Sequence, residues 1–469
     1  MYSNRNSQYG RQPRQEWVRR APVSASPTHP LGEVIENVSR ANLANSQKID
    51  RAEISDTKLI ASYNWVTDSA PKIMIPGKPP RYTPPTHPPK LSWDSGDYYR
   101  DINAASYPKH PLEPAIVSIM TMNPEPTPVN IVACSSAIGN LLRFSRGDED
   151  IRSFRILVEV IGDAVHLIRR ENSPKELIPD VKGFGHTFPE AYTTWDGDAR
   201  RSTSHQRIVK YKFGGLDMMV RFEGDGFIAS PDLKHPKRQS ATAPASNGDA
   251  LLDIANLGFG KAVPRPGTED TQIKVVKGGQ TVPQNAIFDL KTRSANVRDR
   301  QPNRDTIGEQ LHRLWVCQIE RFILAYHEKS VFNDIRIQDV KARVKEWETA
   351  NQPSLKSLAA LLHLIIDRAR KAADGKLELV FSGQDVLQMR KQVSGAGDAL
   401  SPSVRAEWAT WLGTPARSGA GATPWSISKA EINLDDERLD TFSDLYESDD
   451  NKDYTACDKE CGYCGRCTY

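Results

Sequence analysis

Two pairs of polar residues could hold or position a metal ion. Glu223 and Asp225 are two residues apart near the end of the apolar segment LDMMVRFEGDGF, and Asp289 and Lys291 have the same spacing in IFDLKTRS. Residues at positions i and i+2 of a strand project from the same face. We therefore expect each pair to present its side chains together, and the two pairs to converge on one site.

Three carboxylates and a lysine are suited to the hydrolysis of phosphate esters. Mg²⁺ and Mn²⁺ take oxygen ligands, and a bound metal both neutralises phosphate charge and generates a nucleophile from water. A neighbouring lysine can position that water and stabilise developing charge. Alternatively, both pairs are the polar faces of half-solvated strands, which is the usual origin of either motif alone. The occurrence of both motifs in apolar strands favours the metal-dependent nuclease.

The C-terminus carries a second candidate metal site. Four cysteines follow the spacing CxxxCxxCxxC, namely Cys457, Cys461, Cys464 and Cys467. Four thiolates at this density suit tetrahedral zinc. An iron–sulfur cluster, a thiol redox pair and an unliganded tail are the alternatives. The other two cysteines, Cys134 and Cys317, stand in apolar contexts and are expected to pack in the core.

The strands that would carry the acids can be predicted from residue patterns. Residues 153–168 contain two β-rich runs around the turn dipeptide Gly162-Asp163, which predicts a hairpin. Further strands are expected at 216–222, 286–290 and 377–381.

Two helices are expected after the second acid pair. Apolar residues at helical spacing predict one helix through residues 311–326 and another over 354–373 that ends before Gly375. Trp315 belongs to the first apolar stripe and is expected in the core. Strands and helices around one core predict an α+β or α/β fold, with mixed twisted sheets flanked by helices.

Composition divides the 469-residue chain into segments. We expect a disordered basic arm at 1–50, one nuclease-like catalytic domain at 51–400 with an inserted loop at 230–281, and an acidic tail at 401–469 that ends in the cysteine site. Residues 70–90 are too rich in proline for a helix or a central strand and should be extended.

Charge is unevenly distributed although the formal net charge is only +3. Residues 1–20 hold five arginines and one acid, whereas 431–453 hold ten acids and two basic residues. The acidic segment either solubilises the protein or lies on a basic groove as a nucleic-acid mimic.

No segment has the apolar length of a membrane helix or a secretory signal, so we expect an intracellular protein. The compartment is expected to be nuclear or cytoplasmic, and a mitochondrial presequence at the Arg-rich start is the alternative.

Around the pairs Glu223/Asp225 and Asp289/Lys291, the chain resembles the decapping exoribonuclease family, enzymes of the nuclease superfamily with a D…(D/E)xK signature. That family carries, in order, an arginine, a GxxxE motif, an E-hydrophobic-D motif, an E-hydrophobic-K motif and a helix with WxxQ. Here FEGD supplies Glu223 and Asp225, FDLK supplies Asp289 and Lys291, and LWVCQ supplies Trp315 and Gln318. The likeness covers about residues 135–330, and phrases such as ASYNW and YKFGGLD also resemble uncharacterised filamentous-fungal proteins.

The resemblance implies a nuclease-superfamily core and metal-dependent processing of RNA 5′ ends: decapping, pyrophosphohydrolysis or 5′–3′ exoribonuclease action. It implies Mg²⁺ or Mn²⁺ held by Glu223, Asp225, Asp289 and the Leu290 carbonyl. Lys291 and Gln318 would position the attacking water, and Glu190 would complete the site.

The chain departs from the family pattern at four places. Glu190 falls one position later than GxxxE requires, with Pro189 at the expected place. The expected arginine is absent, Ser135 and Ser136 lie near its position, and Arg143 is a possible substitute. Gly224 replaces the apolar residue between the acids, and Asp289 is one methylene shorter than the family's glutamate.

Three other functions compete with RNA processing. A non-catalytic RNA-binding or adaptor protein would have lost the metal and would use its basic residues and cysteine tail to recruit partners. A DNA nuclease could use the same acids. A prenyl-diphosphate synthase would need two aspartate-rich motifs on facing helices, and the only similar segment, 449–453, stands alone in the acidic tail.

Overall fold

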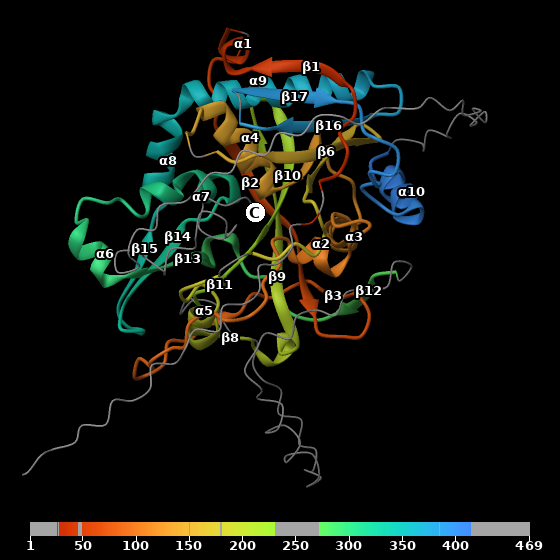
Figure 1. Ribbon diagram of the computed structural model, residues 1–469. Coiled ribbons are helices and arrows are strands. Elements are labelled where there is room, and N and C mark those ends of the chain that lie inside the picture. Colours follow the sequence, from red (N-terminus) through yellow and green to blue (C-terminus); the bar gives the residue numbers. More distant parts are fainter. Residues whose placement is uncertain are drawn as a thin grey trace, which may run out of the picture.

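The computed structural model describes residues 26, 28–45, 49–149, 151–178, 181–229, 272–383 and 385–413. Two mixed β-sheets flanked by helices form the molecule (Figure 1). This is the mixed α+β architecture expected from the sequence.

Among the described residues, eleven strands form the larger sheet. Its spatial order, with bounds, is β1 (Val34–Ser39), β17 (Val386–Arg390), β16 (Lys376–Phe381), β6 (Phe154–Ile161), β7 (Ala164–Arg170), β5 (Ile131–Cys134), β10 (Leu216–Glu223), β9 (Ser202–Phe213), β2 (Ile54–Val66), β3 (Lys72–Ile75) and β12 (Lys274–Lys277).

Six described strands form the smaller sheet, in the order β15 (Val331–Asp339), β14 (Arg321–Glu328), β13 (Ile287–Ser294), β11 (Gly226–Phe227), β4 (Arg81–Tyr82) and β8 (Thr193–Thr194). Helix α5 (Thr187–Tyr192) leads into β8, and α6 (Ala295–Arg300) follows β13.

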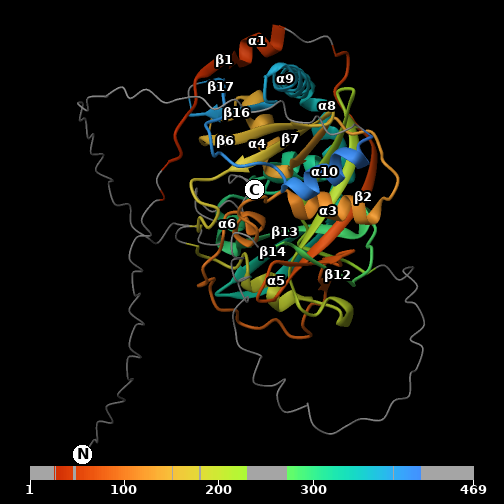
Figure 2. The same cartoon turned by 90° about the vertical axis from the view of Figure 1, so that its right-hand side faces the viewer.

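Helices cover both faces of the larger sheet, because its strands alternate between two apolar cores. On β10, Met218 and Val220 join one core, and Met219 joins the other. The first core includes α4 (Ser135–Arg146), α7 (Leu311–Cys317) and α9 (Gln352–Lys371), with α8 (Lys341–Ala350) packed beside them. The second includes α3 (Glu113–Met122) and α10 (Pro402–Trp411), which lie next to each other in Figure 2, and α2 (Ile102–Ser106) precedes them.

Several predicted elements are confirmed. β6 and β7 pair as an antiparallel hairpin whose turn contains Gly162, with φ of 59°. Helix α9 buries its apolar stripe and is followed by Gly375, with φ of 69° and then by β16.

The helix expected through 311–326 is wrong in its second half. α7 ends at Cys317, Gln318 adopts the left-handed conformation with φ of 53°, and residues Arg321–Glu328 form strand β14. Residues Phe322–Tyr326 are all buried, because the strand lies in the middle of the sheet with both faces covered. A strand buried on both faces appears in sequence as a continuous apolar run, which periodicity does not distinguish from a helix.

The ordered fold extends beyond the expected domain bounds. Strand β1 and helix α1 (Arg40–Asn45) lie within the segment 1–50, β12 lies within 230–281, and α10 follows residue 400. Segment 70–90 contributes the short strands β3 and β4. Residues 1–25, 230–271 and 414–469 are outside the described residues, so the arm, most of the loop and the acidic tail stay predictions.

Candidate active site

The first acid pair lies where the chain passes from one sheet to the other. Glu223 is the last residue of β10 in the larger sheet, and Asp225 stands just before β11 in the smaller one. The expectation that both lie on one strand is therefore wrong, because β10 ends at Glu223. Gly224 makes this crossing, and a Cβ there would lie 3.2 Å from the His205 ring.

The second pair lies on strand β13 and is on one face, as predicted. Phe288 and Leu290 pack in the apolar cluster beneath the small sheet, so Asp289 and Lys291 project to the opposite face. There Asp289 forms an ion pair with Arg313 of helix α7. The side chains are 6% and 3% exposed for Asp289 and Lys291 respectively.

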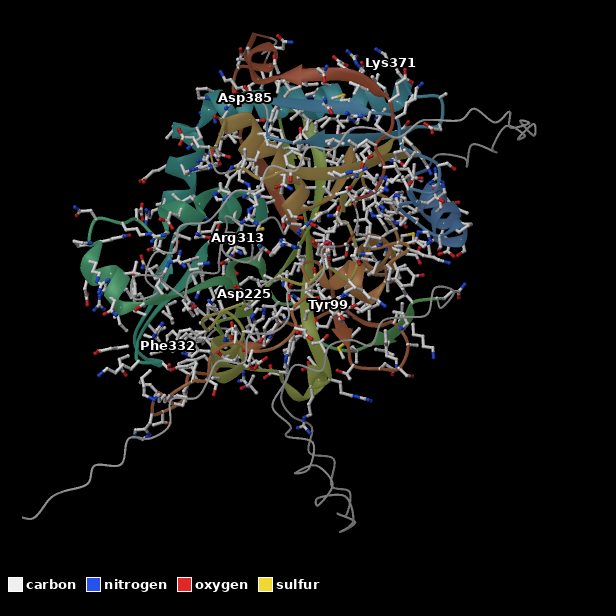
Figure 3. The ribbon with its side chains drawn as sticks, viewed as in Figure 1. Tyr99, Asp225, Arg313, Phe332, Lys371 and Asp385 are labelled. Atoms are coloured by element: carbon white, nitrogen blue, oxygen red, sulfur yellow. The ribbon has the colours of Figure 1, made fainter. Side chains whose placement is uncertain are left out.

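A backbone hydrogen bond joins the two pairs. The Leu290 amide donates to Asp225 Oδ2 at 2.8 Å. This bond holds the Asp225 carboxylate at strand β13, next to the two-residue strand β11 that pairs with β13. Figure 3 shows Asp225 below Arg313, whose charge acts on the Asp225 carboxylate.

The acids influence one another electrostatically. Burial, followed by the charge of Asp289 and, more weakly, of Glu223, raises the pKa of Asp225 to about 8. Burial also raises the pKa of Asp289, against the opposing effects of Arg313 and Lys291. Because the charges of Asp289 and Glu223 act on Asp225, these carboxylates are close enough to share one cation.

Cys317 lies beside this cluster and is inert as a nucleophile. Burial raises the pKa of its thiol to about 12, with Asp289 and Asp225 adding to the rise. The expectation that Cys317 and Cys134 are packing residues agrees with their burial and their free thiols. Cys457, Cys461, Cys464 and Cys467 lie outside the described residues.

The donor set fits a hard divalent cation. Glu223, Asp225 and Asp289 supply carboxylate oxygens, and such oxygens are the ligands that Mg²⁺ and Mn²⁺ prefer. Among the described residues, however, no three acidic, imidazole or thiol side chains are already gathered as a metal site. Asp289 instead forms an ion pair with Arg313. A metal ion would have to displace this guanidinium or share the Asp289 carboxylate with it.

The side chain of Gln318 makes hydrogen bonds to groups other than the carboxylates. Its amide nitrogen donates to the Trp315 carbonyl at 2.6 Å, and its amide oxygen accepts from Thr57 Oγ1 at 3.0 Å. Trp315 itself is buried, as expected of a core residue, and its indole nitrogen donates to Glu348.

Glu190 occupies an exposed position on α5, the helix that leads into the edge strand β8. Burial, followed by the charge of Asp94 and, more weakly, of Glu190, raises the pKa of Tyr98 to about 12.

Near the expected arginine position, Ser135 and Ser136 begin helix α4. Arg143 is buried two turns later and donates to Asn140 on the same helix.

Arg313 is the residue of this site that sequence patterns missed. It lies between His312 and Leu314 on a short helix, and nothing in its spacing distinguishes it from a solvated helix residue. Only the packing of α7 over β13 brings it to Asp289.

No curated protein matches the chain. Among the solved structures that match, S. pombe Rai1 in complex with 3′-FADP is 12% identical, with a TM-score of 0.49, over 76% of this chain and 99% of that one. Candida albicans Rai1 in complex with pU5-Mn²⁺ is 10% identical, with a TM-score of 0.48, over 80% and 99%. K. lactis Dxo1 in complex with manganese is 9% identical, with a TM-score of 0.41, over 78% and 98%.

No described helix is both long and apolar enough to cross a bilayer. A family model described as a domain of unknown function (DUF8563) matches residues 33–393, most of the chain, and the chain therefore belongs to that family.

Proposed function

We propose that this protein is a metal-dependent hydrolase that cleaves phosphodiester or phosphoanhydride bonds at RNA 5′ ends. The observation that carries the proposal is the buried pair Asp225 and Asp289, in which the charge of Asp289 raises the pKa of Asp225, with Lys291 on the same face as Asp289. Buried acids that interact in this way are costly in an ordinary core and are relieved by a cation.

Each side chain has a distinct role in the proposed mechanism. Glu223, Asp225 and Asp289, with the Leu290 carbonyl, would hold Mg²⁺ or Mn²⁺. When bound, the metal supplies charge neutralisation of the phosphate and acidifies a water molecule. The Leu290 amide orients the Asp225 carboxylate. Lys291 Nζ, buried beside the acids, donates hydrogen bonds to the attacking water or to a phosphate oxygen.

The RNA 5′ end as substrate rests on the ordered motifs FEGD, FDLK and LWVCQ. Gln318 would take part only by exchanging its bonds to Thr57 and Trp315 for a substrate contact. Glu190, on helix α5, would complete the site.

The test is cleavage of 5′-end-labelled RNAs that carry a triphosphate, a monophosphate or an unmethylated cap, with a matched DNA strand alongside. Wild type is compared with the Asp289→Ala/Lys291→Ala double variant in Mg²⁺ and in Mn²⁺. We expect release of the 5′ group or of nucleotides by wild type and a loss of at least about 100-fold in the double variant, because the metal ligand and the charge that stabilises the transition state are both removed.

Asp339→Asn, at the distal edge strand of the same sheet, is the control and should cleave as wild type does. Equal cleavage by wild type and the double variant would place the active site elsewhere. Preference for the DNA strand would retain the hydrolase and replace its substrate.

The second candidate function is a non-catalytic RNA-binding or adaptor protein. The ion pair between Arg313 and Asp289 favours it, because a guanidinium already compensates one of the acids without a metal. Absence of cleavage in both metals, with retained RNA binding, would establish this second function in place of the first.

A further inference from the structure

A pocket lies beside Glu223, on the side of β10 that faces helix α2. Its lining includes Arg100, Arg169, Gln206 and Arg221, together with Ser135 and Ser136 at the start of helix α4. The lining residues come from four neighbouring strands, β7, β5, β10 and β9, and from the starts of helices α2 and α4, and three of them are arginines.

Three donors in this lining lack acceptors. Arg169 Nη2, Arg221 Nε and Gln206 Nε2 are buried and have no hydrogen-bond partner within the described part of the chain. The three residues are 9%, 8% and 1% exposed, respectively. Leaving a buried donor unsatisfied costs about 1–3 kcal/mol, so three in one pocket indicate a missing acceptor.

The nearby acids do not meet this demand. Glu171 accepts from Arg169 Nε, which leaves Nη2 toward the pocket. Asp101 Oδ2 lies 3.8 Å from Arg221 Nη2, which is beyond hydrogen-bond distance, and Oδ1 accepts the amides of Asn103 and Ala104 as the N-cap of α2.

Helix α4 adds backbone donors to the same pocket. It is 12 residues long, and its N-cap residue Cys134 makes no side-chain capping bond. The first amides of a helix have no partner within the helix, and the helix dipole places partial positive charge there. A helix N-terminus beside arginines is a common binding arrangement for phosphate.

We propose that this pocket is a phosphate-binding subsite for the phosphate of a nucleotide or polynucleotide. Phosphate oxygens would accept from Arg169, Arg221, Gln206 and the α4 amides. The free space is about 20 Å³, which suits a single phosphate oxygen as the side chains stand, and outward rotation of the long arginines would admit the rest.

The position of the subsite also assigns it a role. Because Glu223 lines the pocket and takes part in the acid cluster, a phosphate bound there would place the adjoining phosphate of a chain at the acids. This role rests on the proposed hydrolase, whereas phosphate binding itself does not.

Phosphate binding by the full chain, measured in EDTA by calorimetry and ³¹P NMR, tests the subsite. Inorganic phosphate and 5′-AMP are the probes, and adenosine is the negative probe. We expect both phosphates to bind and compete with each other, and Arg169→Gln to weaken them about tenfold, since a charge-assisted hydrogen bond is lost. Gln206→Glu keeps the acceptor for Arg221 and puts a carboxylate in place of the free donor, so it should abolish binding.

Arg170→Gln is the matched control, because Arg170 follows Arg169 on β7 and pairs with Glu378 instead of lining the pocket. It should bind phosphate as wild type does. Circular dichroism melting identifies any variant that fails to fold. If Arg169→Gln fails to fold, Gln206→Glu still tests the subsite. Absence of phosphate binding by wild type, or unchanged binding in both pocket variants, overturns the subsite.

The measurement is independent of the proposed hydrolase, because no metal is present. Phosphate binding without any cleavage in Mg²⁺ or Mn²⁺ would retain the subsite and refute the hydrolase. Cleavage without phosphate binding in EDTA would retain the hydrolase and refute the subsite.

Discussion

At the residue scale, Asp225 has its ordinary acidity changed by its surroundings. Burial and the neighbouring acids raise its pKa to about 8, while a backbone amide from Leu290 fixes the carboxylate in place. In the absence of metal, the folded protein therefore keeps a proton on this acid cluster at pH values where the unfolded chain has lost it.

This shift makes folding stability depend on pH. Between about pH 4 and pH 8 the folded state binds more protons than the unfolded state, so the free energy of unfolding should fall as pH rises, by at most about 1.4 kcal/mol per pH unit. The stabilisation from the proton on Asp225 is fully present below the pKa of this group in the unfolded chain. It is lost as the pH rises through the pKa in the folded protein. Asp225→Asn has no such proton, so its slope should be smaller.

Urea unfolding in EDTA, at steps from pH 5 to pH 9, measures the slope. Asp217→Asn, at the opposite end of β10, is the control and should retain the wild-type slope. If wild type and Asp225→Asn show parallel curves, the acids of this cluster do not interact in the way described.

Residue types and spacing pointed to the four candidate residues Glu223, Asp225, Asp289 and Lys291, but not to the ion pair of Asp289 with Arg313. Asp289 and Lys291 share a face because strand alternation is regular, which a sequence shows directly. Arg313 contacts Asp289 from a different element, and such a contact depends on packing that no local pattern encodes.

At the element scale, helix α8 fastens α7 to the larger sheet through one buried acid. Glu348 Oε1 accepts from the Trp315 indole nitrogen at 2.9 Å and from the Ile54 amide of β2 at 2.7 Å. Lys345 forms an ion pair with the same carboxylate. Since α7 also carries Arg313, this acid helps to hold the helix over the active site.

Glu348→Ala should therefore lower the free energy of unfolding by about 3 kcal/mol, because two buried donors lose their acceptor. Chemical denaturation measures the change. Glu346→Ala, at an exposed position of the same helix, should change stability by less than about 0.5 kcal/mol. A similar small change in Glu348→Ala would show that α8 is held by its apolar contacts alone.

The elements that sequence predicted well have a local signal. The β6–β7 hairpin has a turn dipeptide, and α9 has a full amphipathic stripe followed by a glycine. Strand β14 lacks such a signal, since its residues are apolar on both faces and continue the stripe of α7. Neither hydrophobicity nor spacing shows that the helix ends at Cys317.

At the scale of the whole molecule, the candidate active site forms where the two sheets meet. Its residues come from the end of β10, the start of β11, the middle of β13 and helix α7. The sheet order that brings these segments together includes parallel pairs between strands far apart in the chain, such as β5 with β10. Sequence patterns predict each segment but not how the strands are arranged in the two sheets. For this reason Glu223 and Asp225 were expected on one strand, although the chain passes from one sheet to the other between them.

The central claim is that Glu223, Asp225 and Asp289 bind a divalent cation. Manganese binding by the full-length protein, measured by calorimetry and electron paramagnetic resonance, tests it most directly. Mn²⁺ prefers oxygen ligands, so the four C-terminal cysteines should contribute little to the signal.

We predict saturable Mn²⁺ binding by wild type, which tightens as pH rises toward 8 because Asp225 must lose its proton. The Asp225→Asn/Asp289→Asn double variant should bind at least about tenfold more weakly, and Asp339→Asn should bind as wild type does. Failure of wild type to bind Mn²⁺, or equal binding by the double variant, would contradict the metal site and favour the non-catalytic protein.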